Sequence, residues 1–220
     1  MSQSTENRRE FLQRTSLAVL SLPLLANCDA VAQKSNDDLL SLIKKNALQN
    51  EGAGEWNGAK DAPANVSWKT LMSKESDKGE QMTISGTVYQ VDGKTPAPNI
   101  LIYLYHTDIE GYYGRNGDKH RHGRYRSWML TDAKGRYEFQ TIKPAPYPEN
   151  RFAAHIHFTL TSTTLKEDWI DSILFEGDTL ITAREREMAG SKGGFNPIVK
   201  LEKGSNGIWQ ATRNIQLWKA

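Results

Sequence analysis

From residue 82 onward the chain is built from short runs of β-branched and aromatic residues separated by turn-forming residues, and this pattern most constrains its fold. Turns are indicated by Asp92-Gly93, by residues 132–135 and by residues 204–207. Many short strands at such spacing predict an all-β fold, a β-sandwich of mixed or antiparallel strands with one short helix at 179–189. The predicted strands are 83–90, 99–106, 125–131, 136–141, 154–161, 198–203 and 208–217.

Two of these segments make more specific predictions. Residues 99–106 are apolar on both alternations, as in a strand buried on both faces. The turn at 132–135 predicts a hairpin between the strands on either side of it.

The N-terminus has the features of an export signal, which we expect to cover residues 1–32. Asn7–Leu12 contains an arginine pair and resembles a twin-arginine signal, and the apolar run that follows is too short for a membrane span. Cys28 closes this run and suggests a lipoprotein processing site that would anchor the protein to a membrane. Cleavage after Ala32 is the alternative. We therefore expect an exported protein, periplasmic or membrane-anchored.

Residues 33–80 are polar and are expected to be a linker with one short helix at 37–48, ahead of a domain at 81–220. The chain has 28 Lys and Arg against 26 Asp and Glu, a net charge of +2. So small a charge gives no basic surface for a phosphate backbone, so we expect no nucleic-acid binding. The oligomeric state is left open.

The strongest chemical signal is His155-Ile156-His157. On a strand these two histidines project from one face, about 6–7 Å apart along the backbone, while Ile156 and Phe158 face the core. Two imidazoles on one face of a strand commonly bind a transition metal. Two half-exposed histidines that bind no metal would give the same pattern. Just upstream, Tyr147 lies among three prolines, which predict a rigid loop close to the histidine strand.

These segments resemble one family. Thr131–Tyr137, Thr141–Pro148 and His155–Phe158 together are similar to the intradiol ring-cleavage dioxygenases, such as protocatechuate 3,4-dioxygenase and catechol 1,2-dioxygenase. The likeness also includes Gly111-Tyr112-Tyr113, and it is absent from residues 1–80.

The resemblance implies a β-sandwich holding a non-haem Fe(3+) on Tyr113, Tyr147, His155 and His157. Phenolate is a hard anionic donor that favours ferric iron, and a nearby cation favours the phenolate form of tyrosine. The implied substrates are O2 and a catechol, cleaved between its hydroxyl-bearing carbons to a cis,cis-muconate-type product. Tyr147 is implied to leave the iron and accept the substrate's proton. Tyr112 would then be a structural tyrosine.

Two positions depart from the family pattern. The family's arginine, which stabilises charge on the substrate, corresponds to Phe152, and Arg151 lies one residue too early. We expect Arg151 to take that catalytic role only if a bulge brings it back. The family's glutamine corresponds to Ser172. These departures support a rival from another class, a non-catalytic exported β-sandwich that binds a ligand or partner.

The remaining histidines carry weaker signals. His106 ends a strand near Tyr113 and would either support the metal site or only pack. His120 and His122 lie in a polar stretch that predicts a solvated loop.

Overall fold

The computed structural model describes residues 37–48, 57–113, 119–149 and 151–219. The chain forms two compact units, residues 1–41 and 42–220, and all the strands belong to the second. The expected export signal, with Cys28 and the alternative cleavage at Ala32, lies outside the described residues. Within the described part, no helix has the length and apolar character to cross a membrane.

The protein is mainly β-structure, arranged in two mixed sheets. One sheet has the strand order β1-β5-β2-β10-β9, with β11 also pairing with β2, and the other has the order β4-β3-β6-β7-β8. The strands are β1 (Lys69–Leu71), β2 (Gln81–Tyr89), β3 (Leu101–Tyr105), β4 (Arg126–Leu130), β5 (Arg136–Ile142), β6 (His155–Thr161), β7 (Asp168–Phe175), β8 (Ile198–Val199), β9 (Glu202–Lys203), β10 (Trp209–Thr212) and β11 (Ile215–Gln216).

Helices are few and short. A 3-10 turn, η1, spans Ala59–Asp61, and α2 spans Ala183–Met188 within the segment predicted to be helical. Residues 37–48 are also helical. Asn46, in the second unit, donates hydrogen bonds to the carbonyls of Ser162 and Leu165.

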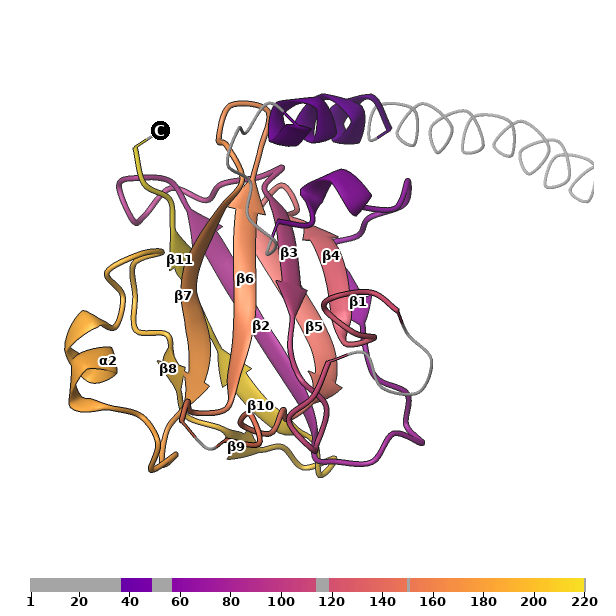
Figure 1. Ribbon diagram of the computed structural model, residues 1–220. Coiled ribbons are helices and arrows are strands. Elements are labelled where there is room, and N and C mark those ends of the chain that lie inside the picture. The colour runs from indigo at the N-terminus through magenta and orange to yellow at the C-terminus, as the bar shows by residue number, and fades with distance from the viewer. Residues whose placement is uncertain (1–36, 49–56, 114–118, 150, 220) are drawn as a thin grey trace, which may run out of the picture. The chain divides into compact units, whose positions relative to one another are not determined.

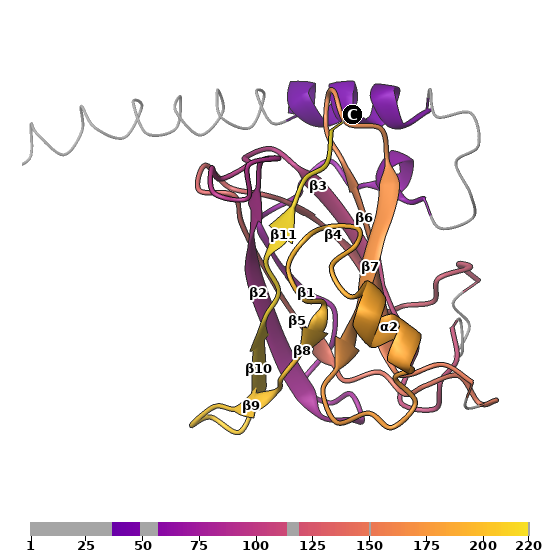
Figure 2. The same ribbon diagram turned by 90° about the vertical axis from the view of Figure 1, so that its left-hand side faces the viewer.

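The two sheets pack face to face and share one hydrophobic core (Figures 1 and 2). Phe158 on β6 packs edge-on against Tyr137 and Phe139 on β5, with ring centroids 6.3 and 5.9 Å apart. All three rings are buried, and burying such a side chain contributes about 1.5–3 kcal/mol. The core thus fixes β6 from one side and leaves its other face for the histidines.

Several sequence predictions are confirmed, and the predicted hairpin is wrong. All five residues of β3 are buried, as expected for a strand covered on both faces. Residues 132–135 do form a turn, with Gly135 N–H donating to the Asp132 carbonyl at 2.8 Å. The strands beside it form no hairpin, because β4 pairs with β3 and β5 pairs with β2 in the other sheet. This turn instead links the two layers. Strand β7 was not predicted.

The folded unit also begins earlier than residue 81. β1 pairs in parallel with β5, so part of the expected linker is a strand of the sheet. Gly58 and Ala59 donate backbone hydrogen bonds to the buried Glu167 carboxylate at 2.8 and 3.1 Å. Thr159 on β6 donates to the same carboxylate at 2.7 Å. Glu167 therefore ties the segment before β1 to the histidine strand.

We expect Glu167→Ala to lower the free energy of unfolding by about 2–3 kcal/mol, because it leaves buried N–H and O–H donors without an acceptor. Urea denaturation measures this loss. Glu176→Ala, at an exposed position, is the matched control and should change stability by less than about 0.5 kcal/mol. Equal effects of the two changes would contradict an anchoring role for Glu167.

Candidate metal centre

The two histidines of β6 lie on the face of the sheet opposite the core, as the alternation predicts. Ile156 and Phe158 are fully buried between the sheets. The Nε2 atoms of His155 and His157 are 3.0 Å apart, and their rings meet nearly edge to face with centroids 4.5 Å apart.

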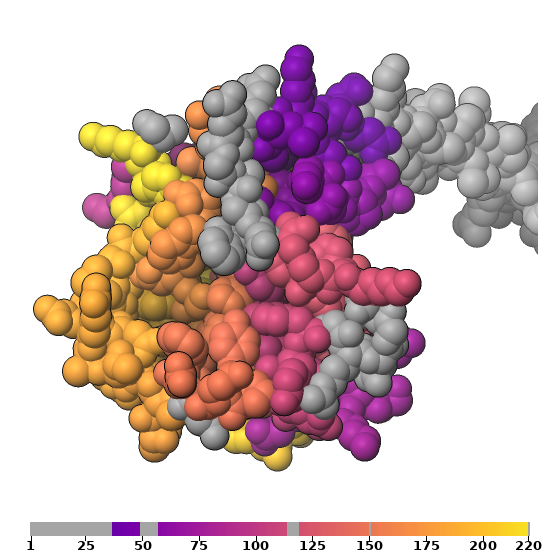
Figure 3. Space-filling model, in the orientation of Figure 1, coloured from indigo at the N-terminus to yellow at the C-terminus, as the bar shows by residue number. Residues whose placement is uncertain are grey.

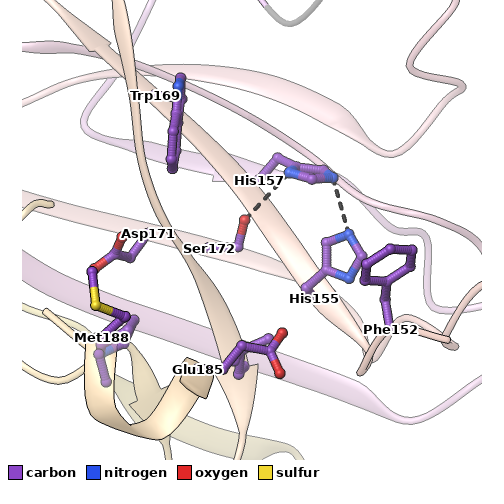
Figure 4. Close-up of a pocket in the computed structure, with 11 residues that line it drawn as sticks. Phe152, His155, His157, Trp169, Asp171, Ser172, Glu185 and Met188 are labelled. Carbon is purple, nitrogen blue, oxygen red and sulfur yellow. Dashed lines mark hydrogen bonds between the residues drawn. The ribbon is translucent and has the colours of Figure 1, made fainter. Parts of the chain in front are cut away.

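A β-bulge shapes this position. The register between β6 and β7 shifts at His157, where β7 carries one more residue than β6. Bulges re-aim side chains and are common beside active sites. Here the bulge brings the Ser172 hydroxyl to 3.3 Å from His157 Nδ1 (Figure 4). Ser172, at the position of the family's glutamine, thus contacts one of the predicted ligands.

Of the two predicted tyrosines, Tyr147 lies beside the histidines and Tyr113 lies beside Tyr147. The Tyr147 hydroxyl lies 3.3 Å from His155 Nε2 and 3.4 Å from His157 Nε2. The Tyr113 hydroxyl lies 2.9 Å from the Tyr147 hydroxyl. Tyr112, by contrast, is 41% exposed. The structure therefore brings together the four side chains that the sequence selected.

The hydrogen bonds of His155 leave its Nε2 free to accept from a proton donor or bind a cation. His155 Nδ1 lies 2.6 Å from the Ala153 carbonyl and must donate to it, because a carbonyl only accepts. The neutral ring then has a lone pair on Nε2, directed toward His157 Nε2. Burial, reinforced by the neighbouring histidines, lowers the pKa of His157 to about 3. Burial also lowers the pKa of His155. Both rings are therefore neutral at physiological pH.

The tyrosines need a nearby positive charge in order to ionise. Burial and the hydrogen bond with Tyr147 raise the pKa of Tyr113 well above its usual value, so its phenolate forms only beside a strong positive charge. Nitrogen and oxygen ligands about 2.0–2.1 Å from a metal lie roughly 3 Å from one another, which matches the 2.9–3.4 Å separations here. In the described residues no three His, Cys, Asp or Glu side chains form a metal cluster. A metal here would need the tyrosines, and two phenolates with two imidazoles fit ferric iron.

Close backbone contacts hold the two tyrosine-bearing loops together. Thr107 Oγ1 donates to the Ala145 carbonyl at 2.7 Å, and Ala145 N–H donates to the Asp108 carbonyl at 3.1 Å. Gly111 has a φ of +82°, and a Cβ there would fall 2.1 Å from the Pro146 carbonyl oxygen. Only glycine allows this approach, which lies two residues before Tyr113 and one before Tyr147.

Two further rings lie behind the histidines. Tyr105 stacks on His157 with centroids 4.7 Å apart, and burial raises its pKa, so its hydroxyl stays neutral. His122 stacks on the other side of Tyr105 at 3.7 Å, with its Nδ1 2.6 Å from the Tyr103 hydroxyl. His122 is only 6% exposed, so the prediction of a solvated loop is wrong for this residue.

His106 is buried and packs beside the loops. Its Nε2 and Nδ1 lie 2.7 Å from the Thr141 hydroxyl and the Thr107 carbonyl, and its ring stacks on Tyr125. Burial lowers its pKa to about 4. Of the two roles considered for His106, these contacts favour packing.

A pocket opens beside the histidines with a volume of about 270 Å³, near the lower end of the range for small-molecule sites. Figure 3 shows the surface hollowed between the residues around α2 and those that precede β6. Phe152 lines this pocket and packs edge-on against Tyr147, with centroids 6.2 Å apart. Arg151 is exposed and is not among the described lining residues, so its catalytic role stays a prediction.

Sequence reasoning missed the far wall of the pocket. Trp169 and Asp171 come from β7, and Glu185 and Met188 come from α2. Figure 4 shows Glu185 facing His155 across the pocket. The helix itself was predicted. The available signal was the acidic Glu185 three positions before the apolar Met188, a spacing that places both side chains on one face of a helix.

Comparison with known proteins shows the family of the chain. A family model described as "Dioxygenase" matches residues 58–192. The chain is 31% identical over 123 residues to the protocatechuate 3,4-dioxygenase beta chain of Burkholderia cepacia, covering 51% of this chain and 52% of that one. It is 30% identical over 89 residues to catechol 1,2-dioxygenase of Acinetobacter baylyi, covering 39% of this chain and 28% of that one. The chain thus spans about half the length of the first relative and less of the second.

A solved structure shares the fold. The dioxygenase domain of a dioxygenase–carbohydrate-binding fusion protein from a cellulolytic Streptomyces matches with a TM-score of 0.53 and 22% identity. The match covers 71% of this chain and 91% of that one.

We expect Gly111→Ala to reduce iron bound after reconstitution with ferric iron by at least about tenfold, because the added Cβ pushes the two tyrosine loops apart. Iron per folded chain is the measurement. Gly177→Ala is the matched control, since Gly177 also has a positive φ, +88°, but open space around its Cβ position. Full iron loading in Gly111→Ala would show that this contact does not position the tyrosines.

Proposed function

Because the chain belongs to the intradiol ring-cleavage dioxygenase family, we propose that it is a ferric-iron dioxygenase that cleaves a catechol between its two hydroxyl-bearing carbons. The observation that carries the proposal is a cluster of two phenol oxygens and two imidazole nitrogens: the Tyr147 oxygen and both nitrogens lie within 3.0–3.4 Å of one another, and the Tyr113 oxygen lies 2.9 Å from that of Tyr147. A protein that used this fold only as a scaffold would have no need to crowd these four groups.

Tyr113, Tyr147, His155 and His157 would hold the iron. When bound, ferric iron supplies a Lewis acid that chelates both catechol oxygens and couples the electrons of the ring to O2. The fixed tautomer of His155 keeps its Nε2 lone pair available without a proton to displace. The Ser172 hydroxyl contacts Nδ1 of His157 and helps to orient that ring.

Tyr147 is proposed to receive the substrate's proton. Its hydroxyl lies within 3.4 Å of both histidines, and its ring faces the pocket wall at Phe152. A phenolate there can take the proton of an incoming catechol hydroxyl, since the two groups have similar affinities for a proton. Phe152 and Trp169 would border the substrate ring and limit water around it.

The proposed reaction balances without a further reductant. The carbon–carbon bond between the hydroxyl-bearing carbons breaks, and each of these carbons gains one oxygen atom from O2. The catechol supplies all four electrons, and the product is a cis,cis-muconate-type diacid.

A non-catalytic binding module remains the rival. It is favoured by Phe152, which places an uncharged ring where the resemblance implies an arginine that stabilises charge on the substrate. The rival keeps the pocket but predicts neither tightly bound iron nor turnover.

We also propose that the protein acts outside the cytoplasm, either free in the periplasm or anchored through Cys28. The support is the arginine pair Arg8-Arg9 followed by a short apolar run. Twin-arginine export carries folded proteins, which suits a protein that takes up its metal first.

Iron-loaded protein is expected to be reddish-brown from tyrosinate-to-iron charge transfer, and Tyr113→Phe should lose most of this absorbance together with at least about 100-fold in kcat. His157→Ala should lose iron as well. Tyr112→Phe is the matched control and should keep colour, iron and activity. Visible spectra, iron content and catechol cleavage measure these effects.

Protein that stays colourless and iron-free after expression with ample iron would support the binding module. Equal losses from Tyr112→Phe and Tyr113→Phe would instead show that the ligand is assigned to the wrong tyrosine.

A further inference from the structure

Building on the proposed function, we infer that this site prefers catechols with an uncharged or cationic substituent over carboxylated ones, and that Glu185 sets this preference. The inference concerns the wall of the pocket opposite the histidines, which the ring-cleavage chemistry itself does not use. It names a substrate class and a specificity residue.

The first step is the charge of the pocket wall. Apart from His155 and His157, the ionisable groups among the described lining residues are Asp171 and Glu185, and both are acids. A carboxylate on the substrate would face these like charges without a compensating cation on this wall.

Glu185 is the better placed of the two acids. Its Oε2 accepts hydrogen bonds from the backbone N–H and the hydroxyl of Thr182, at 2.7 and 2.8 Å, in a capping box at the start of α2. These bonds hold the side chain toward the pocket, where it faces His155 (Figure 4).

Asp171 contributes charge but has a structural role. Its Oδ2 accepts from the backbone N–H groups of Gly190 and Lys192, both at 3.0 Å. It therefore fixes the segment after α2, and its substitution would disturb the pocket wall. Glu185 is the acid that can be neutralised with the least structural change.

The second step is the apolar surround. Phe152, Trp169 and Met188 all line the pocket and are 51–56% exposed, which leaves an apolar rim at its mouth. An adjoining pocket shares His157, Trp169 and Ser172 and continues over Tyr105 and Ile170. An uncharged alkyl or aryl substituent can bury its surface there.

The lysine that contacts this rim is already paired. Lys192 Nζ lies 4.4 Å from the centroid of the Trp169 ring and forms a 2.7 Å salt bridge with Asp168. It does not line the pocket. Lys192 therefore leaves the acidic character of the wall in place.

The test compares 4-methylcatechol, 4-(2-aminoethyl)catechol and 3,4-dihydroxybenzoate with the iron-loaded full chain. We expect kcat/KM for the carboxylated ring to be at least about tenfold below that for 4-methylcatechol. Glu185→Gln should raise the ratio of carboxylated to methylated substrate by about fivefold, mainly through KM, as expected for the loss of one like charge in a partly hydrated site. Dissociation constants measured without O2 should change by the same factor.

Glu187→Gln is the matched control, because it removes the same charge from an exposed position on the same helix. Glutamine keeps the capping box, so Glu185→Gln should fold normally. The inference is supported if only Glu185→Gln shifts the ratio. Preference for the carboxylated ring, or equal shifts in the two variants, overturns it while ring cleavage stands. Loss of binding and cleavage with all three compounds overturns the proposed function and this inference together.

Discussion

Two neutral imidazole nitrogens 3.0 Å apart on the face of one strand are the interaction around which this site is organised. The Ala153 carbonyl fixes the proton of His155 on Nδ1, so the Nε2 lone pair faces its neighbour. A proton on His157 Nε2 can bridge this distance as a hydrogen bond, and a metal cation can take the place of that proton. The same cation is what would turn Tyr113 and Tyr147, whose hydroxyls meet at 2.9 Å, into phenolates. The same close contacts serve as hydrogen bonds without a metal and as ligand spacings with one.

The fold supplies this arrangement through two separate devices. The shared core fixes the strand that carries the histidines, since Phe158 packs between the sheets while His157 points away from them. The tyrosines come from loops, which are not held by strand pairing. Their positions depend on close contacts between the loop backbones instead. Gly111 against Pro146 is one of these contacts and leaves no room for a side chain. The rigid histidine strand and the contacts between the two tyrosine loops together determine whether the two phenol oxygens and two imidazole nitrogens can bind one ion.

The sequence predicted what depends on local pattern and missed what depends on partners far along the chain. The alternation around His155 and His157 is local, and so is the turn at 132–135, but that turn joins different sheets because the pairing of its strands is decided elsewhere. β7 was missed because the bulge opposite His157 breaks its alternation. His122 lies in a polar stretch, yet tertiary stacking on an aromatic ring buries it. The four clustered side chains were therefore predictable, whereas most of the pocket wall was not.

The charge of that wall and the departure at residue 152 point in the same direction. An arginine beside the reacting ring would stabilise negative charge on any substrate and would tolerate a carboxylate. Phe152 supplies no such charge, and Asp171 and Glu185 add negative field to the same pocket. A carboxylated ring would meet both the missing cation and the added acids, whereas a neutral ring meets an apolar rim. Phe152 in place of the arginine is therefore compatible with catalysis on uncharged or cationic catechols, whose substituents bring no negative charge for an arginine to balance.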